Sequence, residues 1–120
     1  MIKQLKFAGI PTRDQDRALK FWTEQVGFRV ATDQPMGRQR WIEFAVPGAE
    51  TRIVLFTPEG HEDRIGTFFN GSFACDDVDY TYEQMKAKGV EFDSPPAKQP
   101  WGTFAKFKDP DGNLFVLASS

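Results

Sequence analysis

The sequence predicts an α+β protein made of two β-α-β-β-β modules, whose curved mixed or antiparallel sheets surround a concave cavity. The first observation behind this prediction is an internal repeat of 62–63 residues. It matches Asp14 with Asp77, Gly27 with Gly89, and Leu55 with Leu117. The second is that both halves follow one order: a strand, a helix, then further strands. Because one helix covers only one face of such a small sheet, the other face requires a partner, which favours paired modules.

The first module is expected over residues 1–57. Residues 5–12 are extended and apolar, and Asp14 is suited to cap the following helix. The apolar positions of that helix have helical spacing, and Gly27 ends it. They are Ala18, Leu19, Trp22 and Val26. Strands are then expected at 28–31, 41–46 and 52–57, with a loop at 33–38.

A polar linker at 58–66 leads to the second module, residues 67–120, and the two modules together form one domain over 1–120. A strand at 67–75 precedes a helix that three aspartates open and Gly89 ends. Those aspartates are Asp76, Asp77 and Asp79. The sequence then predicts a strand at 90–92, a proline-rich loop at 93–100, and a hairpin of 103–107 with 113–118. The hairpin turn is Asp-Pro-Asp-Gly, residues 109–112.

Composition excludes several functional classes. The net charge is −2, the pI is about 5.4, and the 15 Lys and Arg residues are scattered, which disfavours nucleic-acid binding. Cys75 is the single cysteine, so no internal disulfide forms, and His61 is the single histidine. Apolar runs are too short to span a bilayer, so a cytoplasmic protein without a membrane partner is expected.

Three segments carry a resemblance to a known family: IPTRDQDRALKFWTEQVGF (10–28), CDDVDYTYEQMKAKGVEF (75–92) and QPWGTFAKFKDPDGNLFVL (99–117). They resemble the vicinal oxygen chelate superfamily, which groups glyoxalase I, extradiol dioxygenases, fosfomycin-resistance enzymes and bleomycin-resistance proteins. FWTEQVGF and KQPWG are similar to the bleomycin-resistance branch in particular. The resemblance covers nearly the whole chain and implies the glyoxalase/bleomycin-resistance/dioxygenase fold.

Members of this superfamily normally bind a divalent metal through one side chain on each of four equivalent strands. The resemblance puts these positions on Phe7, Val54, Asn70 and Val116. Phenylalanine and valine have no lone pair for a metal, and one asparagine is a weak oxygen ligand. Glu43 on a neighbouring strand would add a single carboxylate. We therefore expect no metal, no cofactor and no catalytic residue of the usual kind.

Strand alternation leaves an apolar concave surface with few polar groups. The expected ligand-binding residues are Phe7, Trp41, Arg52, Asn70 and Trp101. Arg52 suits a planar or anionic ligand, and the alternative is a salt bridge with Glu43. Trp101 lies in the proline-rich loop, which forms the cavity edge in the resembling families. His61 is expected to be an exposed linker residue, and Cys75 a small buried one.

The sequence thus predicts a metal-free small-molecule-binding protein that sequesters an aromatic, antibiotic-like compound and acts as a homodimer. One alternative is an enzyme with a non-standard site: a glyoxalase-type lyase or isomerase, or a dioxygenase-like enzyme. A second alternative is a scaffold whose cavity is filled.

Overall fold

The computed structural model describes residues 1–119, in two compact units: unit 1, Met1–Asp63, and unit 2, which begins at Arg64. Unit 1 contains β1 (Phe7–Pro11), α1 (Gln15–Lys20), the π-helix η1 (Phe21–Val26), β2 (Arg29–Met36), β3 (Gln39–Ala45) and β4 (Arg52–Phe56). A 3₁₀ turn, η2 (Glu62–Arg64), follows. Unit 2 contains β5 (Asn70–Ala74), α2 (Val78–Ala87), β6 (Glu91–Gln99), β7 (Gly102–Lys108) and β8 (Leu114–Ala118). No helix among residues 1–119 is long and apolar enough to cross a membrane.

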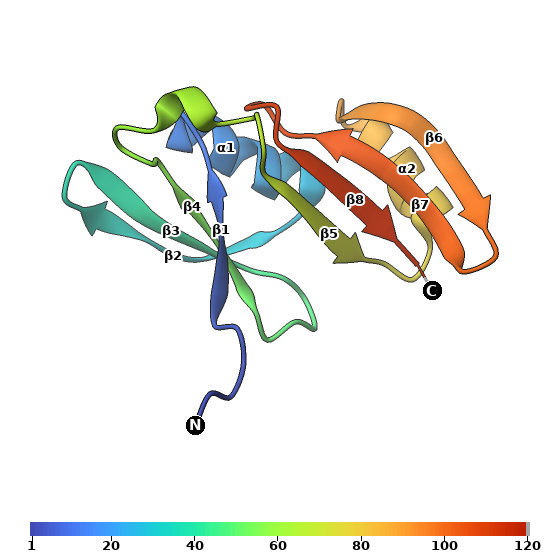
Figure 1. Cartoon of the computed structure of the whole chain (residues 1–120), viewed down its shortest axis with the longest axis horizontal. Helices are drawn as coiled ribbons and strands as arrows, with labels where there is room; N and C mark the ends of the chain where they lie inside the picture. Colours follow the sequence, from blue (N-terminus) through green and yellow to red (C-terminus); the bar gives the residue numbers. More distant parts are fainter. Residues whose placement is uncertain (120) are drawn as a thin grey trace. The chain divides into compact units, whose positions relative to one another are not determined.

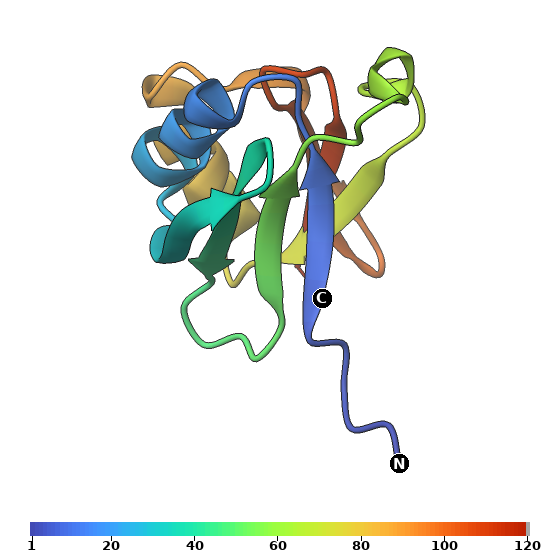
Figure 2. The same cartoon turned by 90° about the vertical axis from the view of Figure 1, so that its left-hand side faces the viewer.

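The two sheets have the same topology. The strand order is β1-β4-β3-β2 in unit 1 and β5-β8-β7-β6 in unit 2, as Figure 1 shows for the latter. One pair in each sheet is parallel, β1 with β4 and β5 with β8, and the other pairs are antiparallel. Figure 2 shows β1 and β4 side by side with their arrowheads at the same end. The predicted α+β class, with two β-α-β-β-β modules and mixed sheets, is confirmed.

Each helix covers one face of its own sheet, and aromatic side chains fill the space between them. In unit 1, the Trp22 ring stacks on Phe28 at 5.4 Å between ring centres, and Phe28 lies 6.2 Å from Phe44 of β3. In unit 2, Tyr82 of α2 meets Phe92 edge-on at 4.6 Å. The buried strand residues of unit 1 alternate: Ile42 and Phe44 face the helix, so Trp41 and Glu43 face away from it. The face of each sheet away from its helix is called the open face below.

The helices begin as predicted but differ in form. Asp14 and Asp77 cap them, each accepting a hydrogen bond from the backbone N–H three residues on. The repeat offset is 63 residues at these caps and 62 at Gly27 and Gly89, so the first helical segment is one residue longer. The π-helix η1 accommodates this residue, since its wider turn joins the Gly27 N–H to the Trp22 carbonyl.

Two segments predicted to be loops are strands. Residues 33–36 belong to β2, because they continue antiparallel pairing with β3 as far as Met36 and Gln39. Residues 93–99 continue the strand predicted at 90–92 and belong to β6 (Glu91–Gln99), although the segment contains Pro95 and Pro96. Both are outermost strands, where proline removes no hydrogen bond that a second neighbour needs. In β6, the register shifts between Ser94 and Ala97, where the two prolines lie.

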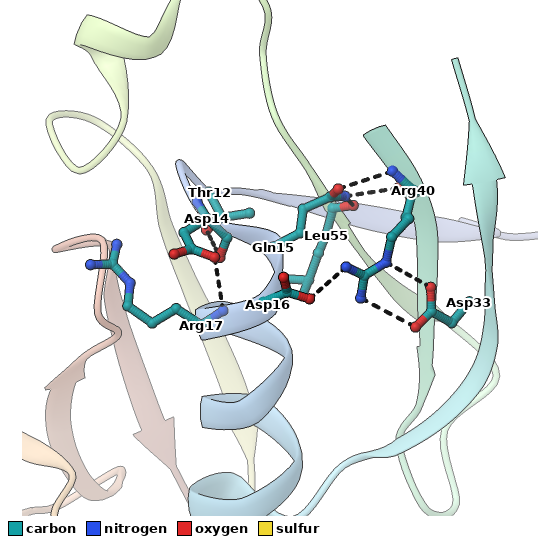
Figure 3. A network of polar contacts seen from close by, with 8 residues as sticks. All are labelled: Thr12, Asp14, Gln15, Asp16, Arg17, Asp33, Arg40 and Leu55. Carbon is teal, nitrogen blue, oxygen red and sulfur yellow. Dashed lines mark hydrogen bonds and ion pairs between the residues drawn. The ribbon is translucent and has the colours of Figure 1, made fainter. Parts of the chain in front are cut away.

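A polar network joins α1 to β3 in unit 1 (Figure 3). The Gln15 amide donates to the Arg40 carbonyl oxygen at 2.7 Å and accepts from the Arg40 N–H at 2.9 Å, as a neighbouring strand would. The Arg40 guanidinium pairs with Asp33 and Asp16. Hydrogen bonds to Asp33 and then Asp16 raise the Arg40 pKa above its ordinary value. The network fixes the start of the helix on the sheet.

The Asp-Pro-Asp-Gly turn between β7 and β8 forms as predicted and is organised by Asp109. One carboxylate oxygen of Asp109 accepts the backbone N–H groups of Asp111 and Asn113, at 3.0 and 2.9 Å. The other accepts the Asn113 side-chain amide at 2.9 Å. Asp109 is buried, and removal from water raises the pKa of its carboxyl group to about 6.

The raised pKa predicts a pH-dependent stability. The folded state binds the Asp109 proton more tightly than the unfolded chain, so the free energy of unfolding falls as pH rises through about 6. The loss is on the order of 2 kcal/mol between pH 4 and pH 7.5. Urea unfolding at several pH values measures it against Asp109→Asn, which lacks the titrating group. Parallel pH profiles for the two proteins would contradict the prediction.

Candidate functional site

The open face of unit 1 carries three of the five predicted ligand-binding residues. Phe7 on β1 is the register partner of Arg52 on β4, and Trp41 lies on β3 beyond β4. The Phe7 and Trp41 rings meet edge-on, with centres 5.2 Å apart and planes at 88°. Phe7 is 39% exposed, so this aromatic pair is accessible on the open face. Alternation along β1 and β4 predicted that Phe7 and Arg52 share a face, and the structure adds Trp41 of β3 to them.

Arg52 forms an ion pair with Glu43, which is one of the two roles expected for it. Its Nη1 lies 3.1 Å from Oε2 of Glu43, and the other carboxylate oxygen of Glu43 accepts the indole N–H of Trp41 at 3.1 Å. The Arg52 side chain is 42% exposed and that of Glu43 is 21% exposed. The open face of unit 1 thus combines aromatic rings with an internally balanced pair of charges.

Unit 2 contains the other two predicted residues, on separate elements. Trp101 lies in the turn between β6 and β7 and is 68% exposed. It lines a surface pocket of about 450 Å³ with Cys75, Phe104 and Ala118 among its neighbours. Asn70 is the exposed first residue of β5, outside the residues that line this pocket. The pocket gives Trp101 an apolar surrounding that suits an aromatic ligand.

The positions of Cys75 and Phe104 beside this pocket were not predicted from the sequence. Cys75 is half-buried beside the pocket, and burial is the main cause that raises the pKa of its thiol, which keeps it protonated and weakly nucleophilic. Phe104 was not predicted as a pocket residue, although its alternation with the buried Ala105 places it on the open face. His61 is exposed, in the polar segment where it was expected.

A second surface pocket, in unit 1, is polar. It has a volume of about 460 Å³, and Arg13, Gln15, Gln39 and Arg40 are among its lining residues. The Gln15 and Gln39 amides bond backbone groups of β3 and of Thr57, and Arg40 is held by two carboxylates. These side chains serve to hold the sheet and helix together.

The four positions that correspond to metal ligands do not fit a transition metal. Phe7 and Val54 lie on neighbouring strands of unit 1, and Asn70 and Val116 on neighbouring strands of unit 2. Only Asn70 has a donor atom, a neutral oxygen. Within residues 1–119, no group of three or more His, Cys, Asp or Glu side chains is arranged to hold a metal ion. We derive no chemistry through a metal here.

The fold, the repeated module and the two open faces define a protein of the glyoxalase type of α+β architecture. A model of the "Glyoxalase/Bleomycin resistance protein/Dioxygenase superfamily" matches residues 4–117, and the chain belongs to this superfamily. The Bacillus subtilis (strain 168) protein YetH, which is uncharacterized, is 46% identical over 98% of each chain. YurT of the same organism, also uncharacterized, is 37% identical over 88% of this chain and 90% of its own.

Two solved structures extend the comparison. UcmS2 is 34% identical, with a TM-score of 0.91 over 100% of both chains. TnmS3, described as an antibiotic binding protein from Streptomyces sp. CB03234, is 35% identical, with a TM-score of 0.84 over 98% of this chain and 96% of its own.

Proposed function

We propose that this protein binds a flat, partly apolar small molecule without a metal, and acts by holding and sequestering it. The observation that carries the proposal is the pairing of Phe7 with Trp41 on the open face of unit 1, where a metal-dependent member would present a ligand at position 7. Aromatic rings bind planar ligands by contact area and by edge and face electrostatics. The similarity to an antibiotic-binding protein supports the same function.

The binding residues in this proposal are Phe7, Trp41 and Arg52 of unit 1 with Asn70 and Trp101 of unit 2. The aromatic residues supply contact area, and Arg52 and Asn70 supply hydrogen bonds that orient the ligand. An aromatic, antibiotic-like compound suits the residues of either unit.

The proposal extends to assembly and location. A homodimer would cover the apolar side chains that each chain exposes, which include Leu5 before β1, Phe7 at its start and Trp101 in unit 2. The single half-buried cysteine suits a reducing, cytoplasmic compartment.

Tryptophan fluorescence tests the function. We expect saturable quenching by members of a library of planar aromatic compounds, unchanged by excess EDTA, since no metal takes part. Trp101→Ala should weaken binding of a quenching compound by about three- to tenfold, the loss of one aromatic contact of 0.5–1.5 kcal/mol. Trp101→Phe, which retains a ring, should lose less.

Three outcomes of this titration would contradict parts of the proposal. Absence of saturable quenching by every compound would reject small-molecule binding of this kind. Quenching that EDTA abolishes would reject the metal-free mechanism. A compound bound equally by wild type and Trp101→Ala would remove Trp101 from the site.

A further inference from the structure

Glu43 is the residue that connects the aromatic and charged parts of the open face of unit 1. It lies on β3 two residues after Trp41, and its register partner on β4 is Val54, two residues after Arg52. One carboxylate oxygen accepts the Trp41 indole N–H, and the other pairs with Arg52, both at 3.1 Å. Both oxygens of a single side chain are therefore engaged, each with a different predicted binding residue.

These contacts set the position of the Trp41 ring from two sides. The hydrogen bond to Glu43 holds the indole nitrogen, and the edge-on contact with Phe7 holds the ring at 5.2 Å between centres. A hydrogen bond to an ionised acceptor is stronger than one between neutral groups. The aromatic surface is thus arranged before any ligand arrives, which lowers the entropic cost of binding.

The same carboxylate changes which ligands Arg52 can attract. Its negative charge lies 3.1 Å from the guanidinium, so an approaching anion meets attraction from Arg52 and repulsion from Glu43. A guanidinium has five N–H donors, more than one carboxylate oxygen uses, and it can still donate to a neutral carbonyl oxygen. The face therefore favours an uncharged planar ligand that carries a hydrogen-bond acceptor.

We propose that Glu43 is a positioning and specificity-determining residue, which orients Trp41 and balances Arg52 so that the open face of unit 1 selects uncharged planar aromatic compounds over aromatic carboxylates. This inference rests on the proposed small-molecule binding and adds the charge class of the ligand. It assigns discrimination between ligands to a carboxylate beside the aromatic rings rather than to the rings themselves.

Two probes of equal ring size, 2-naphthamide and 2-naphthoate, test the selectivity by isothermal titration calorimetry. Wild type should bind the amide about tenfold more tightly than the carboxylate, which is roughly the effect of one charge–charge contact. Glu43→Gln should lose this preference or reverse it, because Arg52 then attracts the carboxylate unopposed. Glu50→Gln, an exposed carboxylate in the turn before β4, is the control and should behave as wild type.

The double variant Glu43→Gln/Arg52→Gln separates charge balance from general damage. It removes both charges, so the gain in naphthoate binding seen in Glu43→Gln should disappear. A gain that persists without Arg52 would overturn the assignment, as would a wild type that binds both probes equally while small-molecule binding itself stands.

A measurement without ligand tests the positioning role of Glu43 separately from the proposed function. In ¹⁵N–¹H spectra, Trp41→Phe identifies the indole N–H signal of Trp41. Glu43→Gln should shift that signal and leave the Trp22 signal in place, because Trp22 lies in the core. If neither probe binds wild type, the selectivity fails, while the quenching titration decides the proposed function and the indole signal decides positioning. An unmoved Trp41 signal overturns it.

Discussion

Gly66→Ala is expected to destabilise the protein by about 3 kcal/mol or more. Gly66 has a φ of +81°, where side chains other than glycine are strained by about 1–3 kcal/mol. A Cβ atom there would also lie 2.3 Å from the backbone carbonyl oxygen of Asp111, in the turn that Asp109 organises. Gly66 lies in its own turn, closed by the Thr67 N–H and the Arg64 carbonyl oxygen at 3.2 Å, so relieving the clash requires one of two hydrogen-bonded turns to shift. Urea unfolding followed by circular dichroism measures the loss.

Gly60→Ala is the matched control for this substitution. Gly60 has nearly the same φ, +84°, but a Cβ there would meet no atom within 4 Å. It should lose only the conformational part, about 1–3 kcal/mol. The difference between the two variants therefore isolates the contact with Asp111. Equal losses in the two variants would mean that the linker does not pack on the turn.

Trp22→Ala is expected to cost about 3–5 kcal/mol of stability, the usual loss for a large aromatic side chain in a core. Trp22 is 0% exposed, stacks on Phe28 and meets Phe21 edge-on at 5.1 Å. Removing the ring leaves a cavity between the first helical segment and the sheet of unit 1. Differential scanning calorimetry should show a large fall in Tm.

Trp101→Ala supplies the comparison. The Trp101 side chain is 68% exposed, whereas Trp22 is 0% exposed. Its removal should change stability by no more than about 0.5 kcal/mol. The two variants thus separate a tryptophan that holds the fold from one available to a ligand. A Tm for Trp22→Ala equal to that of Trp101→Ala would contradict the observed packing.

Local sequence determined those parts of the fold that depend on neighbouring residues. Asp14 and Asp77 cap helices and Asp109 starts a hairpin turn, because each acts on backbone groups within four residues. The repeat then predicted two equivalent sheets. The four strand positions where metal ligands are replaced were implied by the family resemblance, and the repeat agrees with them because equivalent positions are 62–63 residues apart.

Tertiary structure decided the features that depend on pairing between distant segments. Residues 93–99 have a loop-like composition, yet they form part of β6 because β7 supplies the hydrogen-bond partners. Trp101 and Cys75 are 26 positions apart but line one pocket. Both roles depend on where other strands lie, which composition and periodicity do not specify.

The role of Arg52 shows the same division. Strand alternation predicted that Arg52 and Phe7 share a face, because successive side chains point to opposite sides of a sheet. Alternation left the ion pair with Glu43 as one of two alternatives. The register of β3 on β4 decided it by bringing the two side chains to 3.1 Å. The sequence by itself thus determined that Phe7 and Arg52 lie on one face, and only the cross-strand register determined which charges meet there.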